Sequence, residues 1–317
     1  MIKLILRQLF FVITTFFGVT LITFYLQTLA PNTGEEQQYS EYIARVFQGD
    51  LGVSSSTRTP VSEEFLAHLP ASVELVVLAS TLALFIGLPL GIVSAINHRK
   101  PTDLIINYTS LTAYSMPIFW WGIILIMFFS LNLGVTPVAG RLSFLFDIEP
   151  VTGFILIDTF ISKEPYHMDA FKDAIHHLTL PVLVLATMPT AIIARMARQT
   201  MLETLANDYM LTAQAKGLSK FKIYWVHGLR NALIPFTNML VLQISTLMTG
   251  AMLTEYLFSL PGIGKWILDA LEKSDFQSLQ GGILITTTLV IFINAIIEML
   301  QTWLNPKRLK RTRIYNG

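Results

Sequence analysis

Residues 72–96 read SVELVVLASTLALFIGLPLGIVSAI, an apolar run in which Glu74, near its start, is the single charged residue. The hydrocarbon core of a bilayer is about 30 Å thick, so a helix needs about 20 such residues to cross it. Backbone polar groups in lipid must be satisfied within the segment itself, which favours a helix for a run of this length. The stretch therefore predicts a transmembrane helix and places the chain among integral membrane proteins.

Five further apolar stretches flank this run on both sides. They cover Leu9–Leu29, Ile105–Leu131, Leu178–Ala194, Ala232–Leu253 and Gly282–Leu300. Pro117 interrupts the stretch that begins at Ile105, and the stretch that begins at Leu178 is marginal in length and carries Pro181 and Pro189. We expect prolines to lie where spans bend or begin. The chain is therefore predicted to be an all-α membrane protein with six transmembrane helices.

The composition of the 317 residues agrees with this class. Hydrophobic residues make up 53% of the chain and charged residues only 14%, against about 25% charged residues in soluble proteins. The net charge of +1 gives no indication of a nucleic-acid partner. There is no cysteine, so disulfides and thiolate chemistry are excluded. We expect no catalytic residue and no cofactor. We also expect no metal site, because the adjacent His176 and His177 would point apart on a helix.

Lysine and arginine are distributed unequally, which predicts the orientation of the spans. With both termini in the cytoplasm, the outside segments hold seven of the 22 basic residues. The cytoplasmic segments hold the other fifteen, namely Lys3, Arg7, Arg99, Lys100, Arg195, Arg198, Lys216, Lys220, Lys222, Arg230, Lys307, Arg308, Lys310, Arg311 and Arg313. Two long loops then lie outside, at about residues 30–71 and 132–177, and one lies inside, at about 195–231.

The long cytoplasmic loop carries the most informative sequence. Residues 194–235 read ARMARQTMLETLANDYMLTAQAKGLSKFKIYWVHGLRNALIP. A helical pattern runs to Lys216, Gly217 is suited to the left-handed conformation that ends a helix, and Ser219 is a suitable N-cap for a second helix. Two short helices with a sharp bend are therefore expected. Composition alone leaves two roles open, a docking surface for a cytoplasmic partner or a basic segment held on anionic lipid.

At about twenty positions of fixed spacing, this stretch resembles the cytoplasmic "EAA" loop of binding-protein-dependent ABC permeases, in the form found in the dipeptide/oligopeptide/nickel family. The name-giving glutamate is absent, since Leu211 and Thr212 precede Ala213. The resemblance implies that a coupling loop at residues 195–235 inserts into a groove of an ATPase subunit. It also implies that the residues of this contact are Glu203, Asp208, Tyr209, Ala213, Ala215, Lys216, Gly217 and Leu218.

Further segments extend the resemblance over nearly the whole chain. Residues 49–54 and 69–75 match the first outer loop, residues 254–265 resemble an E-x-x-F-x-x-P-G-x-G signature, and residues 305–308 resemble a closing D-P-R turn. The signature implies that Glu255, Pro261 and Gly262 line or gate the pathway. A structural role, in hydrogen bonds to helix ends or interfacial water, is the alternative for Glu255 and the preferred one for Glu74. Residues 149–158 are similar to the Sap branch, and Glu298 is expected to pair with Arg195 or Arg198.

The resemblance implies a type I ABC importer permease fold, with residues 1–70 forming the first transmembrane helix and outer loop and residues 71–317 the permease core. The chain would be a non-enzymatic, multi-pass subunit of a bacterial inner membrane and would form half of a pathway for peptides, with antimicrobial peptides or a polyamine as other cargoes. Its partners would be a second permease, two cytoplasmic ATPases, a periplasmic peptide-binding protein and the lipid bilayer. No phosphate-binding loop is present, so ATP hydrolysis belongs to another chain. The alternatives are an ion-coupled secondary transporter and an intramembrane enzyme.

Overall fold

The computed structural model describes residues 2–28, 38–219, 221–230, 232 and 247–304. These residues form helices joined by loops, with one isolated bridge between Val53 and Pro60. They fall into two compact units: residues 1–74, 139–174 and 258–317 belong to the first, and residues 75–138 and 175–257 to the second. The predicted closing turn at residues 305–308 lies outside the described residues, and the predicted division at residue 70 stays a prediction.

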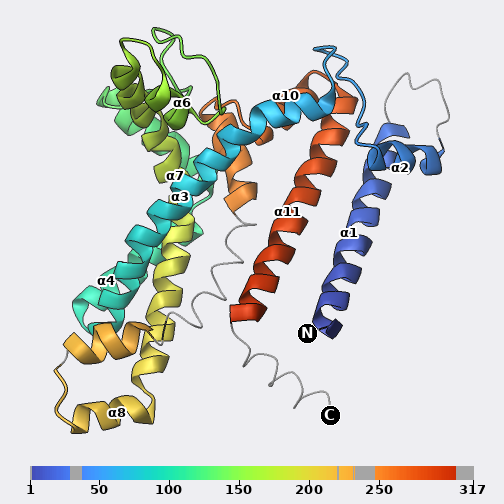
Figure 1. Cartoon of the computed structure of the whole chain (residues 1–317). Helices are drawn as coiled ribbons and strands as arrows, with labels where there is room; N and C mark the ends of the chain where they lie inside the picture. Colours follow the sequence, from blue (N-terminus) through green and yellow to red (C-terminus); the bar gives the residue numbers. More distant parts are fainter. Residues whose placement is uncertain (1, 29–37, 220, 231, 233–246, 305–317) are drawn as a thin grey trace. The chain divides into compact units, whose positions relative to one another are not determined.

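The first unit contains the two ends of the chain. Helix α1 (Ile2–Thr28) packs along α11 (Phe276–Leu304), and α10 (Ile263–Glu272) packs on α11 (Figure 1). Helix α2 (Tyr39–Phe47) folds back on α1, where Tyr39 and Tyr42 form hydroxyl hydrogen bonds of 2.9 and 3.0 Å with Thr20 and Thr23. The unit also contains the first part of α3 (Val61–Ile96), the short α6 (Ile155–Ile161) and the first turns of α7 (His167–Leu205).

The second unit is built on the close approach of α3 and α7. A Cβ atom at Gly87 would lie 2.8 Å from the carbonyl oxygen of Thr190, and one at Gly91 would lie 2.6 Å from Cβ of Ala197. Small residues four positions apart let helix backbones approach closely in this way. The remaining elements of the unit are α4 (Pro101–Ser115), α5 (Ile118–Leu125), the π-helical η1 (Ile126–Asn132), α8 (Asp208–Ala215), the π-helical η2 (Lys222–Gly228) and a helix at residues 247–257.

Three of the predicted spans lie in helices that are long and apolar enough to cross a membrane, namely α3, α7 and α11. The sequence suggested that the stretch beginning at Leu178 is marginal in length, but the helix that contains it is long. Helix α7 has 39 residues and runs through Pro181 and Pro189 without ending. Prolines are tolerated in membrane helices where neighbouring groups satisfy the freed backbone carbonyls.

The predicted span Ile105–Leu131 is divided into two helices that are bent by 104° at the break between Ser115 and Ile118. Met116 is extended there, with φ −80° and ψ 127°. The cause is Pro117, because proline disfavours the helical conformation in the residue that precedes it. The interruption predicted at Pro117 is therefore confirmed, and it divides the stretch into a helix pair.

The number of spans among the described residues is three, or four if the bent pair forms one span. Helix α1 contributes a shorter apolar section, Leu9–Tyr25. Most of the predicted span Ala232–Leu253 lies at residues 233–246, outside the described residues, although residues 247–257 are helical. The count of six therefore stays a prediction.

Candidate functional site

The coupling loop predicted at residues 195–235 is described up to residue 230, apart from residue 220. Helix α7 continues into it as far as Leu205, α8 follows, and α8 ends at Ala215 before Gly217, whose φ is +76°. The predicted helix stop is thus confirmed. Phe221 is already helical, and η2 follows from Lys222. The hydroxyl of Ser219 accepts the N–H of Lys222 at 3.5 Å and its carbonyl accepts the N–H of Ile223 at 3.0 Å, as expected of an N-cap.

A few buried side chains hold this loop in place. Met201, Met210 and Ile223 are buried, and Met201 belongs to an apolar cluster with Ala95 and Ala232. Helix α8 packs on η2, and a Cβ atom at Gly228 would lie 2.7 Å from Cε of Met201. The anchors lie on one side of the two segments, so the other side is free to carry exposed groups.

The exposed side of the loop is rich in large apolar residues. We call Tyr209, Phe221, Trp225 and Val226 the docking face; their side chains are between 41% and 67% exposed, and the rings of Phe221 and Trp225 lie 6.4 Å apart. Clusters of exposed apolar residues on a soluble segment mark interaction sites. Sequence reasoning did not single out Phe221, Trp225 or Val226. Their spacing of four and five positions, which places them on one helix face, was the available signal.

The residues predicted to contact the ATPase are mostly exposed in the structure. Leu218 is half-buried, Tyr209 belongs to the docking face, and the side chain of Ala213 lies outside the described residues. The exposed members besides Tyr209 are Glu203, Asp208, Ala215, Lys216 and Gly217. A Cβ atom at Gly217 would meet nothing within 4 Å, so the backbone conformation, and not crowding, requires glycine there.

A buried ion pair fixes α7 to the turn between α3 and α4. Arg198 donates from Nε to Oδ1 of Asp103 at 2.7 Å and from an Nη atom to Oδ2 at 2.8 Å. The carboxylate of Asp103, which is 1% exposed, also accepts hydrogen bonds from the Ser94 hydroxyl, the Arg99 main chain and the Asn107 amide. The side chain of Glu298 lies outside the described residues, so its expected pairing with Arg195 or Arg198 stays a prediction. Arg198 and Asp103 are 95 positions apart, so no local sequence pattern indicated that they form an ion pair.

The candidate gate residues are divided between the two units. Glu255 is buried in the helix at residues 247–257 of the second unit. Pro261 and Gly262 belong to the first unit, where Gly262 precedes α10 and the N–H of Ile263 donates to the Ser72 hydroxyl at 2.8 Å. Pro261 and Gly262 thus lie at the start of a helix, and a pathway or gating role for Glu255, Pro261 and Gly262 stays a prediction.

Two groups of hydrogen-bonded carboxylates occupy the first unit; Glu74 and Asp275 are buried, and Glu64 is half-buried. Glu74 accepts the N–H groups of Ile155 and Leu156 at 3.2 and 3.0 Å, so the preferred role of Glu74, a hydrogen bond to a helix end, is confirmed. Glu64 accepts hydrogen bonds from Trp266 and Ser278 at 2.9 and 3.3 Å. We call the residues around Asp275 and Glu64 the carboxylate cluster; the other members are Ser54, Ser55, Ser56, Thr57, Thr59, Trp266 and Ser278.

The negative charge of Asp275 is stabilised by hydrogen bonds within this cluster. Its carboxylate accepts the hydroxyls of Ser54, Ser56 and Ser278 and the N–H groups of Ser55 and Ser278, the last two at 3.2 Å. Burial alone would raise the pKa of Asp275, but these hydrogen bonds to the charged form outweigh it and hold the pKa below its usual value. The cluster is therefore satisfied by neutral donors of its own unit. Sequence reasoning missed it because all of these donors except Ser278 lie about 220 positions from Asp275.

Comparison with known proteins assigns the family. Residues 87–310 match the family described as binding-protein-dependent transport system inner membrane component. The chain is 46% identical to the di/tripeptide transport system permease protein DppB of Pseudomonas aeruginosa and 42% identical to the dipeptide transport system permease protein DppB of Escherichia coli, in both cases over 97% of this chain and 98% of the relative. It is 37% identical to the putrescine export system permease protein SapB of Escherichia coli, over 98% of each chain.

The long apolar helices and the helical loop with its exposed aromatic face are those of a membrane permease, and not of a catalytic subunit. The chain belongs to the family of inner membrane components of binding-protein-dependent transport systems. The family resemblance predicted from the coupling loop is therefore confirmed. Both DppB and SapB proteins are relatives over nearly the whole chain, and identity to the DppB proteins exceeds identity to SapB.

Proposed function

We propose that the chain forms half of the translocation pathway of an ATP-driven importer of short peptides. In this proposal six spans cross the inner membrane, with both termini in the cytoplasm. The partners are a second homologous permease, two cytoplasmic ATPases and a periplasmic peptide-binding protein. The names of the DppB relatives support peptides as cargo.

The observation that carries the proposal is the construction of the coupling loop. Its buried anchors Met210 and Ile223 fix α8 and η2, while Phe221 and Trp225 remain exposed on the other side. A loop that exists only to connect two spans gains nothing from holding aromatic side chains in water. Docking of a second protein would bury them, at roughly 25 cal/mol per Å² of apolar surface. Neither an ion-coupled transporter acting alone nor an intramembrane enzyme needs such a face.

The test is the substitution Gly217→Val, with Gly49→Val as its matched control. Both glycines have open space around them and nearly equal backbone angles, φ +76° and +78°, so valine causes the same backbone strain at each. Gly217 lies in the coupling loop and Gly49 in the first predicted outer loop. We expect Gly217→Val to enter the membrane with the second permease but to lose ATPase binding and uptake, while Gly49→Val retains both.

ATPase pull-down and peptide uptake measure the two effects. Retention of both by Gly217→Val would show that Gly217 only ends a helix, and equal losses in both variants would show that backbone strain alone is responsible. The proposed orientation is checked separately. A reporter that is active only in the periplasm should work when fused near Asp158 and fail when fused near Lys216.

A further inference from the structure

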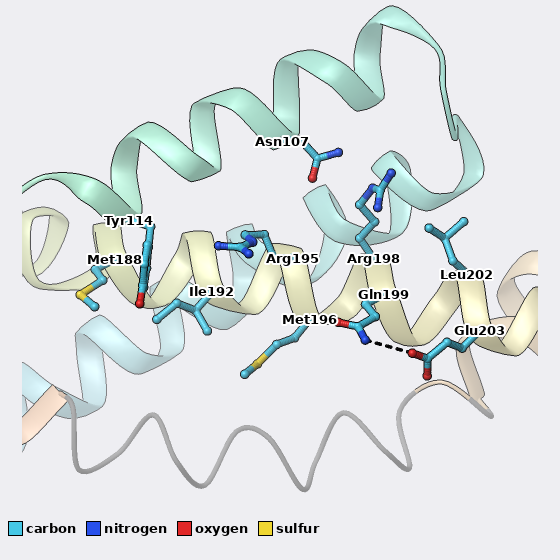
Figure 2. Close-up of a pocket in the computed structure, with 10 residues that line it drawn as sticks. All are labelled: Asn107, Tyr114, Met188, Ile192, Arg195, Met196, Arg198, Gln199, Leu202 and Glu203. Atoms are coloured by element: carbon cyan, nitrogen blue, oxygen red, sulfur yellow. Dashed lines mark hydrogen bonds between the residues drawn. The ribbon is translucent and has the colours of Figure 1, made fainter.

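A cavity of about 810 Å³ lies between α4 and α7 in the second unit (Figure 2). Sites for small molecules typically enclose about 300–1,000 Å³. Helix α4 contributes two lining residues, and α7 contributes the rest from one face. The lining residues are Asn107, Tyr114, Met188, Ile192, Arg195, Met196, Arg198, Gln199, Leu202 and Glu203.

The cavity has one positive charge that is not committed to a carboxylate. Arg198 is held by Asp103, whereas Arg195 lies with its guanidinium 5.8 Å from the centre of the Tyr114 ring. Among the described residues, no carboxylate lies within ion-pair distance of Arg195, and the side chain of Glu298, its expected partner, is outside the described residues. The aromatic ring fixes the guanidinium without neutralising it.

A negative charge lies at the other end of the same face. Glu203 is exposed and accepts a hydrogen bond of 3.0 Å from the Gln199 amide, drawn in Figure 2. Arg195 and Glu203 are eight positions apart on α7, which corresponds to about 12 Å along the helix axis. An extended chain of three residues spans about 10 Å. The axial separation of the two residues is thus close to the length of a short peptide.

We propose that this cavity binds the transported peptide as a zwitterion, with Arg195 receiving its terminal carboxylate and Glu203 its terminal ammonium group. Glu203 then serves the cargo, and not the ATPase contact that the family resemblance implies for it. The inference rests on the proposed function and adds to it a site and a substrate class, peptides of two or three residues with free ends. The apolar side chains of Met196 and Leu202 provide a wall that accepts different peptide side chains, since methionine packs adaptably. A phospholipid headgroup would engage Arg195 through its phosphate.

The experiment measures equilibrium binding to the assembled complex of both permeases and ATPases in nanodiscs, without nucleotide and without the binding protein. The ligands are trialanine and trialanine amide, which lacks the terminal carboxylate. For the wild type, we expect the amide to bind at least about tenfold more weakly, since a charge-assisted pair is lost. Arg195→Gln should weaken trialanine binding by a similar factor and should not weaken amide binding further. Such non-additivity shows direct contact between the two groups.

Arg99→Gln is the control, because it removes the same charge from an exposed residue on the same predicted side of the membrane, outside the cavity. It should leave both affinities unchanged. For the opposite end, Glu203→Gln should weaken trialanine and leave N-acetyl-trialanine unaffected. The wild-type comparison of ligands needs no variant and holds even if a variant assembles poorly.

Equal binding of trialanine and its amide by the wild type would overturn the inference, as would additive losses in Arg195→Gln. It would also fall if Arg195→Gln released bound anionic phospholipid and left the affinity for trialanine unchanged. These failures differ from failure of the proposed function. In that case the wild-type complex with its binding protein would show no ATP-dependent uptake of trialanine at all.

Discussion

In the first unit, the carboxylates of Asp275 and Glu64 accept hydrogen bonds from hydroxyl, indole and main-chain groups of the same unit, whereas in the second unit the coupling loop leaves Phe221 and Trp225 exposed. The carboxylate cluster is complete by itself, because every charge in it has donors nearby. The coupling loop has buried anchors that fix its fold, but its exposed aromatic side chains have no covering surface among the described residues. Covering its exposed aromatic rings with another surface would be favourable. The difference thus separates a part that stabilises the fold from a part that, in our proposal, binds a partner.

The C-terminal part of α7 combines both properties within one helical turn. Arg198 donates two hydrogen bonds to the buried carboxylate of Asp103. Arg195, three positions earlier, lines the cavity with no carboxylate partner among the described residues. The same residue type therefore serves packing at one position and, in our proposal, cargo binding at the other. Three substitutions test the comparison, in order of decreasing expected effect.

Replacing Arg198 by methionine should cause the largest loss. It leaves the carboxylate of Asp103 buried without its cation, a defect that typically costs about 3–5 kcal/mol. We expect a strongly lowered melting temperature of the purified complex, measured by tryptophan fluorescence. The double variant Arg198→Met with Asp103→Asn should recover part of the loss, because the buried charge is gone. A melting temperature equal to that of the wild type would show that the pair does not hold α7.

Replacing Trp225 by alanine should change binding and leave folding intact. Trp225 is 41% exposed, so its truncation should cost less stability than the roughly 3–5 kcal/mol that is typical of a buried tryptophan. If it is a hot spot of the docking face, ATPase binding should weaken by at least about 2 kcal/mol. Phe144→Ala is the matched control, since Phe144 is 95% exposed in the first unit. Equal ATPase affinity of both variants would remove the docking face from the coupling surface.

Replacing Asp275 by asparagine should cost about 1–3 kcal/mol, because its hydroxyl and N–H donors lose a charged acceptor. The folded pKa of Asp275 is below its unfolded value of about 3.9, so its stabilisation is fully present above about pH 4 and is lost as the pH falls through the folded pKa. The melting temperature of the wild type should therefore approach that of Asp275→Asn in acid. ATPase binding should not change. A constant difference between the two proteins at all pH values would contradict this role.

The sequence by itself determined what depends on neighbouring residues. Apolar runs predicted the helices α3, α7 and α11, Pro117 predicted an interruption, and Gly217 predicted the end of α8. Each of these follows from hydrophobic length or from the backbone angles that a residue allows, which act within one or two helical turns. The same local motifs were enough to identify the permease family.

Only the tertiary structure decided which distant groups meet. It paired Arg198 with Asp103, gave Asp275 its serine donors, turned the break at Pro117 into a bend of 104° and formed the cavity that contains Arg195. These outcomes depend on which helix faces pack together, and glycines such as Gly87 and Gly91 set that packing across about 100 residues of chain. The sequence around a charged residue does not show which distant residue will pair with it. The pairing of charges therefore becomes known only once the packing of the helices is known.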